Sequence, residues 1–419
     1  MTKADKEEQR KTPILRFKGF TDDWEQRQLS NVIKLIGGNA FKGSSAVKEG
    51  IPWLKITNVG KNGINWDTQF YLPFSFWNKW PNYQLFSGDY VMALTRPVLD
   101  HTLKIGKMDR KALLNQRVSK LEFNFDKEFT FQLLQRKKTV IEIEKELAGS
   151  DPPNLGSKNL KNIKIFLSVN PDEQKRIGLL FRCLDNLLAL YDRKLKLLSQ
   201  VKKYFLDNLF TEKEYPNLRF KGFTDAWEQR KLGEIGTTYS GLSGKNKSDF
   251  EKGNSNFVTF LEVLNNPVLK NIDLTNKVEI KENEHQNKVK RNDILFNTSS
   301  ETPEEVATST VVEVNQDNLY LNSFCFGFRP NIQFSNYYIG YYLRSNHFRS
   351  KVFCLAQGIS RYNISKKSLI KLKLSLPKLE EQDKIGKIFN RLELLLNLYE
   401  NKQQHLTKIK KTLLNTMFI

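Results

Sequence analysis

One segment of this sequence occurs twice, nearly unchanged. The segment PILRFKGFTDDWEQR that begins at Pro13 returns as PNLRFKGFTDAWEQR at Pro216, 203 positions later (216 − 13 = 203). A second motif, EQKRIG at Glu173, returns as EQDKIG at Glu381, 208 positions later (381 − 173 = 208). Two copies at so long a period exclude a solenoid or propeller and indicate internal pseudo-two-fold symmetry. Such a protein suits a ligand that is itself roughly two-fold, of which duplex DNA is the commonest.

The charge of the chain favours a polyanionic partner. Lys and Arg number 67 against 46 acidic residues, which gives a formal net charge of +21 over 419 residues. Basic proteins release counterions when they neutralise phosphates, and this favours nucleic acid. We find no apolar run of about 18 residues and no apolar core of a signal peptide near the N-terminus. We therefore expect no membrane contact and a cytoplasmic location.

The cysteines and histidines predict neither a disulfide nor a metal site. Three cysteines, an odd number, are far apart at Cys183, Cys325 and Cys354, and we expect all three to be buried free thiols. The four histidines are also scattered, with no spacing typical of metal ligands. We expect this chain to bind no metal.

Two long helices are predicted where the second motif occurs. Apolar residues recur at steps of three and four from Pro171 to Phe210, and again in the C-terminal copy, which falters only at Gln403. The first stripe consists of Ile177, Leu180, Leu184, Leu187, Tyr191, Leu195, Leu198, Val201 and Phe205, and the second of Ile385, Ile388, Leu392, Leu395, Tyr399, Leu406, Ile409 and Leu413. Each helix could be an ordinary core helix. Charged residues on the other faces favour instead an antiparallel coiled coil that acts as a spacer.

Before each helix lie about 150 residues that read as an α+β globular domain. Short apolar runs broken by turn residues predict strands at 51–56, 89–94, 120–123, 256–261, 293–296 and 324–328. Helices are predicted at 130–146 and 337–355. The organisation we predict is a globular domain at 1–168 with the repeated block 13–30, a helix at 169–211, a globular domain at 212–376 with the block 216–233, and a helix at 377–419.

Two further correspondences indicate that the scaffold repeats while its surface differs. Residues 88–96 parallel 292–300, and 160–165 parallel 369–374. The repeated residues Arg16, Phe17, Trp24, Arg219, Phe220 and Trp227 are predicted to dock each domain on the helices rather than to contact DNA.

Motifs that suggest catalysis are incomplete. Asp151-Pro152-Pro153-Asn154 resembles the loop with which amino-methyltransferases hold a base, but Asn154 stands where an aromatic ring is required. We interpret it as a turn. The run from Gly38 to Ser45 has the glycine spacing of a phosphate loop, but it lacks the lysine that reaches the terminal phosphates. We predict no catalytic residue in this chain.

Taken in order, the motifs carry a family resemblance. Two variable globular domains, each followed by a long helix that opens with Glu-Gln-x-(Arg/Lys)-Ile, resemble the specificity subunit of type I restriction-modification systems. The first domain also has Gly50-Ile-Pro-Trp-Leu-Lys-Ile56 and Leu114-Asn-Gln-Arg-Val118, which look like motifs of the family's target-recognition domains. The second domain departs from both, with Asn256-Phe-Val-Thr259 and Asn322-Ser-Phe324 at those places.

The resemblance implies a non-catalytic subunit. Each target-recognition domain would read one half of a split site on double-stranded DNA, and the helices would set the gap. Two modification subunits would add the N6-adenine methyl group, and restriction subunits would cut DNA. S-adenosylmethionine, ATP and Mg²⁺ would belong to those partner chains. The alternatives are a coiled-coil adaptor that binds only proteins and a stand-alone DNA enzyme such as a fused methyltransferase.

The DNA-contacting residues are sought in exposed polar loops, because Arg, Lys, Asn, Gln, Ser and Thr read bases while Lys and Arg hold phosphates. The first domain offers Lys42, Ser44, Ser45, Asn58, Lys61, Asn62, Thr95 and Arg96. The second offers Lys245, Asn246, Lys247, Thr298, Ser299, Ser300, Arg361, Tyr362 and Asn363. Tyr362 could stack on a base, or its ring could pack on a neighbouring strand. The sequence leaves open which of these residues contact bases and which contact phosphates.

Overall fold

The computed structural model describes residues 11–149, 151–358 and 361–419. The chain divides into two compact units. Unit 1 contains the described residues up to Asp192 together with Lys402–Ile419, and unit 2 contains Arg193–Asn401. Each unit holds a globular α+β domain and one segment of each long helix, α5 (Pro171–Asn208) and α10 (Leu379–Thr416).

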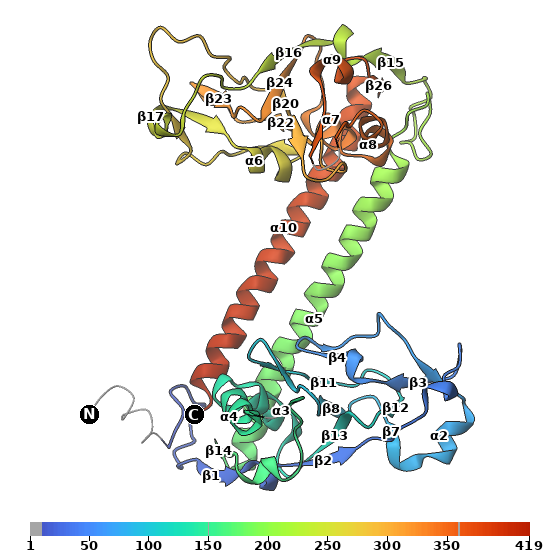
Figure 1. Cartoon of the computed structure of the whole chain (residues 1–419), viewed down its shortest axis with the longest axis vertical. Coiled ribbons are helices and arrows are strands. Elements are labelled where there is room, and N and C mark those ends of the chain that lie inside the picture. Colours follow the sequence, from blue (N-terminus) through green and yellow to red (C-terminus); the bar gives the residue numbers. More distant parts are fainter. Residues whose placement is uncertain (1–10, 150, 359–360) are drawn as a thin grey trace. The chain divides into compact units, whose positions relative to one another are not determined.

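The globular part of unit 1 is built on two four-stranded sheets (Figure 1). In the first sheet all neighbours are antiparallel, in the order β11 (Ile105–Lys107), β8 (Tyr90–Ala93), β13 (Val118–Phe123), β2 (Ile33–Gly37). The second has the order β6 (Tyr71–Leu72), β3 (Ile51–Leu54), β12 (Ala112–Leu114), β7 (Gln84–Leu85), with β3 and β12 parallel.

Shorter ladders and helices complete unit 1. The ladders pair β1 (Glu25–Gln28) with β14 (Lys164–Leu167), β4 (Val59–Gly60) with β5 (Gly63–Ile64), and β9 (Val98–Leu99) with β10 (Thr102–Leu103). The helices are α2 (Ser75–Lys79), α3 (Lys127–Gln135) and α4 (Lys137–Leu147). The main core contains Trp24, Phe129 and Phe181 and so joins the residue just before β1 to α3 and the N-terminal part of α5.

Unit 2 repeats this plan with one strand more in its main sheet. That sheet has the order β16 (Gly236–Ser240), β24 (Cys325–Pro330), β20 (Ile294–Asn297), β22 (Ser309–Val312), β18 (Val268–Leu269). The second sheet has the order β19 (Lys277–Val278), β17 (Phe250–Val258), β23 (Leu319–Leu321), with β17 and β23 parallel. The ladders pair β15 (Glu228–Lys231) with β26 (Lys373–Leu376) and β21 (Ser299–Ser300) with β25 (Tyr362–Asn363), and the helices are α6 (Phe260–Asn265), α7 (Asn336–Tyr342), α8 (Asn346–Phe353) and α9 (Lys366–Leu369).

Backbone hydrogen bonds fix which residues of the two units are equivalent. The amide of Leu94 donates to the carbonyl of Arg117, and in unit 2 the amide of Thr298 donates to that of Phe324. Likewise Ala93 donates to Lys104 and Asn297 to Thr308, while Leu29 donates to Ile163 and Leu232 to Leu372. The predicted correspondences of 88–96 with 292–300 and of 160–165 with 369–374 are therefore confirmed.

The long helices pair antiparallel within each unit (Figure 1). In unit 1 the ring of Phe181 lies 5.7 Å from that of Phe418, and Asp185 pairs with Lys410 at 2.6 Å. In unit 2 Lys194 lies over Tyr399, and Lys202 pairs with Glu393 at 2.7 Å. In both units the number of the partner residue, on α10 or just after its end, falls as the number on α5 rises, so the predicted antiparallel pairing is confirmed.

The predicted stripe is wrong at one equivalent position in each helix. Leu187 and Leu395 are 41% and 39% exposed, whereas the next residues, Leu188 and Leu396, turn inward. The path from Leu184 to Tyr191 can pass through Leu187, in steps of three and four, or through Leu188, in steps of four and three. Both paths fit a helix, and both intermediate residues are leucine. Only packing against the neighbouring helix distinguishes them.

Several predicted elements differ from the structure. The strand expected at 256–261 ends at Val258, because the hydroxyl of Thr259 accepts from the amide of Glu262 and caps α6. The helices expected at 130–146 and 337–355 are each two helices, α3 with α4 and α7 with α8. Between α7 and α8 the backbone of Ser345 is extended and its hydroxyl donates to the carbonyl of Tyr342, a local bond that competes with helix continuation. Arg136 is likewise extended between α3 and α4.

The expectation of three buried thiols is correct for Cys325 alone. Cys183 and Cys354 are exposed. Cys183 lies on α5 outside the inward stripe, next to the exposed Arg182, so its small apolar character does not place it in the core.

The repeated opening block docks each domain on a long helix, as predicted. The guanidinium of Arg16 binds both carboxylate oxygens of Glu173, one at 2.9 Å, and Nε1 of Trp24 donates to the same carboxylate at 3.1 Å. In unit 2, Arg219 binds both oxygens of Glu381 at 2.8 Å. Phe17 and Phe220 pack against the respective cores. The recurring Glu of the Glu-Gln motif is therefore an anchor for the domain that precedes it.

Candidate nucleic-acid interface

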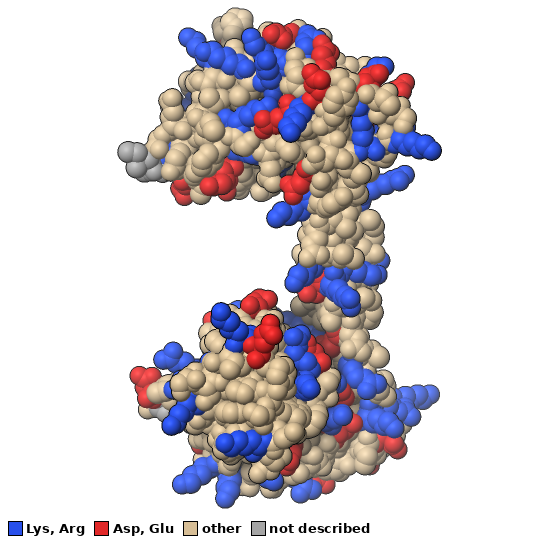
Figure 2. Space-filling view, turned by 90° about the vertical axis from the view of Figure 1, so that its right-hand side faces the viewer, with Lys and Arg blue, Asp and Glu red and all other residues tan. Residues whose placement is uncertain are grey.

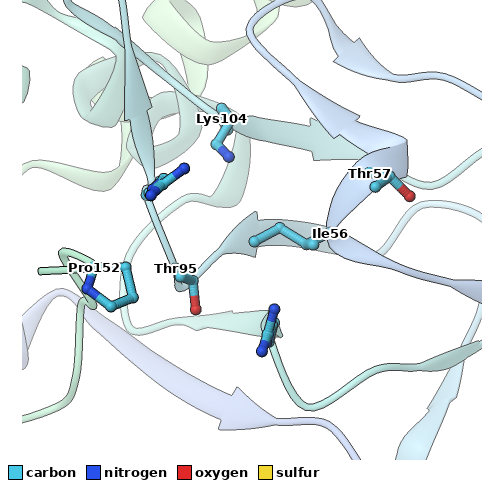
Figure 3. A pocket seen from close by; sticks show the side chains of 7 residues that line it. Ile56, Thr57, Thr95, Lys104 and Pro152 are labelled. Atoms are coloured by element: carbon cyan, nitrogen blue, oxygen red, sulfur yellow. The ribbon is translucent and has the colours of Figure 1, made fainter.

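A cavity of about 420 Å³ in unit 1 gathers residues from five separate segments. Ile56 and Thr57 come from the turn after β3, Thr95 and Arg96 follow β8, and Lys104 precedes β11. Figure 3 shows the labelled side chains of Ile56, Thr95 and Lys104 around one opening, with Pro152 beside it. Arg117, just before β13, completes the lining. The ends of β8, β11 and β13 thus meet at one place, although their residues are distant in sequence.

The Asp151-Pro152-Pro153-Asn154 segment forms one wall of this cavity. The carbonyl of Pro153 accepts from the amide of Arg96 at 2.7 Å, and Oδ1 of Asn154 accepts from the hydroxyl of Thr95 at 3.2 Å. These bonds hold Arg96 at φ +46°, a left-handed conformation that non-glycine residues seldom adopt. A turn that holds a strained arginine at a surface cavity is a common property of binding sites.

The cavity is strongly positive. Three of its lining residues, Arg96, Lys104 and Arg117, are cationic and none is acidic. No ion pair joins any of these three to a carboxylate among residues 11–149, 151–358 and 361–419, whereas the nearby Lys61, Lys107 and Lys120 are all paired. Burial, and then the charge of Arg96, lowers the pKa of Lys104 below its ordinary value. The arrangement offers hydrogen-bond donors and charge to an anionic group.

The other predicted residues of unit 1 lie on separate turns. Lys42, Ser44 and Asn62 are exposed and Ser45 is half-buried. Lys61, in the turn between β4 and β5, binds Asp100 at 3.0 Å and so approaches the β9–β10 turn that follows Arg96.

Asn58 is not an exposed reader, and its prediction is wrong. It is 2% exposed, its Oδ1 accepts from the amide of Lys55, and its Nδ2 donates to the carbonyls of Asn65 and Thr68. The side chain organises the turn after β3, because an amide placed between three backbone groups satisfies them all.

In unit 2 the structure brings two of the predicted groups together. Ser299 and Ser300 in β21 pair with Asn363 and Tyr362 in β25. Thr298 is half-buried, and Arg361 and Asn363 are exposed at the same edge. The ring of Tyr362 packs partly against the core, which favours the packing alternative over base stacking.

Two predicted positions of unit 2 are not exposed. Ser300 is buried and its hydroxyl donates to Glu305 at 2.6 Å. The side chain of Lys245 is 5% exposed because its ammonium binds Glu284 and the carbonyl of Glu279. The neighbouring Asn246 and Lys247 are exposed. A lysine in a polar loop is expected to be unpaired, but Glu284, 39 positions away, neutralises Lys245.

The residues that sequence reasoning missed are Lys104, Arg117, Thr57 and Ile56. Arg117 belongs to a motif recognised above, Leu114-Asn-Gln-Arg-Val118, so a signal existed for it. Lys104 has no local signal. It reaches the cavity because the Lys104 carbonyl accepts from the amide of Ala93 across the β8–β11 ladder.

The net charge is not concentrated in one patch on the face that Figure 2 shows, where Lys and Arg are interspersed with acidic residues over both units. Among the described residues, no cluster of His, Cys, Asp and Glu side chains could hold a metal ion. Within the same residues, none of the helices combines the length and apolar character needed to span a bilayer.

The chain is similar to proteins of one family throughout. A family model described as the type I restriction modification DNA specificity domain matches residues 21–200 and again 224–408. A type I restriction enzyme specificity subunit of Methanocaldococcus jannaschii, MjaVIII, is 36% identical over 48% of this chain and 48% of its own length. A putative specificity subunit of the same organism, MjaX, is 23% identical over 94% of this chain and 93% of its own.

A solved structure has the same fold. The S subunit of a type I restriction-modification system from M. genitalium aligns with a TM-score of 0.63 and 17% identity, over 97% of this chain and 99% of that one. With the family model matching both halves, this chain belongs to the type I restriction-modification specificity subunits and carries two target-recognition domains.

Proposed function

We propose that this chain selects the DNA sequence on which a type I restriction-modification complex acts, each target-recognition domain reading one half of a split site. The observation that carries the proposal is that the two domains share one backbone ladder but present different residues at equivalent loop positions. Arg96 and Arg117 in the first domain are equivalent to Ser300 and Phe324 in the second. A shared backbone that carries different side chains at equivalent positions suits the recognition of two half-sites of different sequence.

The chemistry is proposed to belong to partner chains. N6-adenine methylation and ATP-dependent restriction would be carried out by modification and restriction subunits, which would hold S-adenosylmethionine, ATP and Mg²⁺. In this proposal the chain itself is not an enzyme. Its contribution is to hold duplex DNA in register with those subunits.

Two copies of a modification subunit are proposed to bind the long helices. Leu187 and Leu190 on α5 are exposed, and so are Leu395 and Leu398 on α10, at positions displaced by 208 (395 − 187 = 208; 398 − 190 = 208). Exposed leucines cost solvation free energy unless a partner covers them. The same pair on each helix supports two equivalent docking sites for two copies of one partner.

The test is to express the chain with its modification subunits in cells and to map the methylated adenines. We expect one bipartite sequence with a fixed gap. The purified chain alone should shift duplex DNA at low salt and transfer no methyl group. A protein-only adaptor would shift no duplex at low salt, and a stand-alone methyltransferase would methylate without a partner; either result would refute the proposal.

A further inference from the structure

We propose that the cavity formed by Arg96, Lys104 and Arg117 holds one phosphate of the DNA backbone and is the anchor of the first target-recognition domain. The inference rests on the proposed function and adds to it a phosphate site in one domain. The sequence left open whether Arg96 contacts a base or a phosphate, and the residues around it decide the matter.

Charge favours a phosphate over a base. The cavity brings three cations together with no acidic residue among its lining, and the charge of Arg96 already disfavours the charged form of Lys104. An anion relieves this repulsion and accepts charge-assisted hydrogen bonds from all three groups. The edge of guanine also presents only acceptors in the major groove, but it is neutral and cannot offset three positive charges.

The position of the cavity favours a phosphate carried on a polymer. The side chains of Arg96 and Arg117 are exposed, so the ligand binds at the surface rather than in an enclosed chamber. Ile56 and Pro152 add apolar walls beside the donors, and Thr57, an exposed residue, also lines the opening. A phosphodiester with its sugar presents this combination of an anion next to apolar carbon.

The second domain lacks this constellation. The ladder hydrogen bonds make Ser300, Thr308 and Phe324 the equivalents of Arg96, Lys104 and Arg117. The hydroxyl of Ser300 is already bonded to Glu305, and Phe324 is 61% exposed. Asn363 pairs with Ser299 as Asn154 pairs with Thr95, so Asn363 is the equivalent of Asn154. Counting back two residues makes Arg361, a cation, the equivalent of Pro152. The two domains therefore hold the DNA backbone differently, and the first contributes the phosphate anchor.

The decisive measurement is the salt dependence of DNA binding by the full chain with its modification subunits. The triple variant Arg96→Gln, Lys104→Gln, Arg117→Gln is compared with wild type on a duplex carrying the mapped site and on a random duplex of equal length. Because three cations share one phosphate, the slope of log K against log salt should fall by about 1 and not by about 3. Affinity should fall by about 10- to 100-fold on both duplexes alike.

A control variant removes the same charge elsewhere in unit 1. Arg27→Gln, Lys34→Gln, Lys145→Gln removes three exposed cations that are paired with Glu25, Glu122 and Glu142. It should change the slope much less. The cavity variant should melt no lower than wild type, because removing like charges that face each other does not destabilise the fold.

Three results would overturn the phosphate anchor. They are a fall in slope of about 3, a loss confined to the mapped site together with methylation at new sequences, and an effect no larger than that of the control variant. If wild type prefers its mapped site and one of these results is obtained, only the anchor is refuted. If wild type shows no preference between the two duplexes, the proposed function fails and the inference fails with it.

Discussion

Two carboxylates, Glu173 and Glu381, join the globular domains to the long helices. Both are almost completely buried and each binds an arginine of the repeated block. They differ in one contact, since Trp24 donates to Glu173 whereas Nε1 of the equivalent Trp227 has no partner among the described residues. A buried carboxylate with three donors is more strongly held than one with two.

Glu173→Gln should therefore weaken the docking of the unit 1 domain on α5 more than Glu381→Gln weakens the docking of the unit 2 domain on α10. Removing the charge leaves a mostly buried arginine unpaired, at a cost of about 3–5 kcal/mol. Hydrogen exchange of β1 and β15, followed by mass spectrometry, reports each docking separately. Faster exchange in β15 of Glu381→Gln than in β1 of Glu173→Gln would contradict the ranking, and each variant serves as the control for the other.

The ion pair of Lys245 and Glu284 predicts a pH dependence. The hydrogen bond from Lys245, and then that from Gln286, lowers the pKa of Glu284 from its ordinary value of 4.5 to about 2. A group whose pKa is depressed by folding stabilises the fold above its unfolded pKa and loses that contribution as pH falls. The difference in melting temperature between wild type and Glu284→Gln should be constant above pH 5 and should shrink from about pH 4.5 toward pH 2. A difference that grows in acid would contradict this.

At the scale of the element, α5 and α10 are each a helix of 38 residues whose inward face is chosen by packing. Leu394, Leu395 and Leu396 follow one another, yet only Leu396 is buried, at 9% exposure. Gln403 is polar and interrupts the predicted apolar stripe, yet it is half-buried. The inward face of α10 therefore continues through this position, because the helix geometry turns the residue toward the neighbouring helix.

Leu396→Ala and Leu395→Ala form a matched test of that face. The two substitutions remove the same atoms one residue apart. Leu396→Ala should destabilise the protein by about 2–3 kcal/mol, near the low end for core leucines because the site lies between helices. Leu395→Ala should change stability by no more than about 0.5 kcal/mol. Urea unfolding measures both, and equal effects would show that the inward face is wrongly assigned.

At the scale of the whole molecule, the duplication gives each unit the same plan and the same helix pairing. We propose in addition that the helices set the gap between the two half-sites. Four residues inserted into α5 between Leu187 and Val201, with four more in the paired stretch of α10, nearly preserve the stripe because they add about 1.1 turns. They lengthen each helix by about 6 Å.

The gap between methylated half-sites should then grow by about two base pairs, since duplex DNA rises about 3.4 Å per pair. Mapping methylated adenines in cells that express the insertion variant with its partners measures this. The half-site sequences should stay the same, which controls for damage to either domain. An unchanged gap would show that the helices do not act as the spacer.

The sequence by itself determined the plan of this protein. Two α+β domains and an antiparallel helix pair were predicted from the sequence alone. The prediction used the repeated blocks, the three- and four-residue steps of the helices, and the alternation of globular stretches with long helices. These features follow from local periodicity and from duplication. Arg16, Trp24 and Arg219 were also assigned correctly to docking, since they belong to the part that repeats.

Only the tertiary structure decided which polar residues face outward and which cations meet. Asn58, Lys245 and Ser300 are polar residues of predicted loops, yet each is held by other groups of the fold. Asn58 and Ser300 bind groups 10 and 5 positions away, and Lys245 binds Glu284, 39 positions away. Lys104 and Arg117 reach Arg96 through the ladders of β8 with β11 and β13. The physical reason is that strand register brings together residues far apart in the chain, and no local pattern encodes the partner across the sheet.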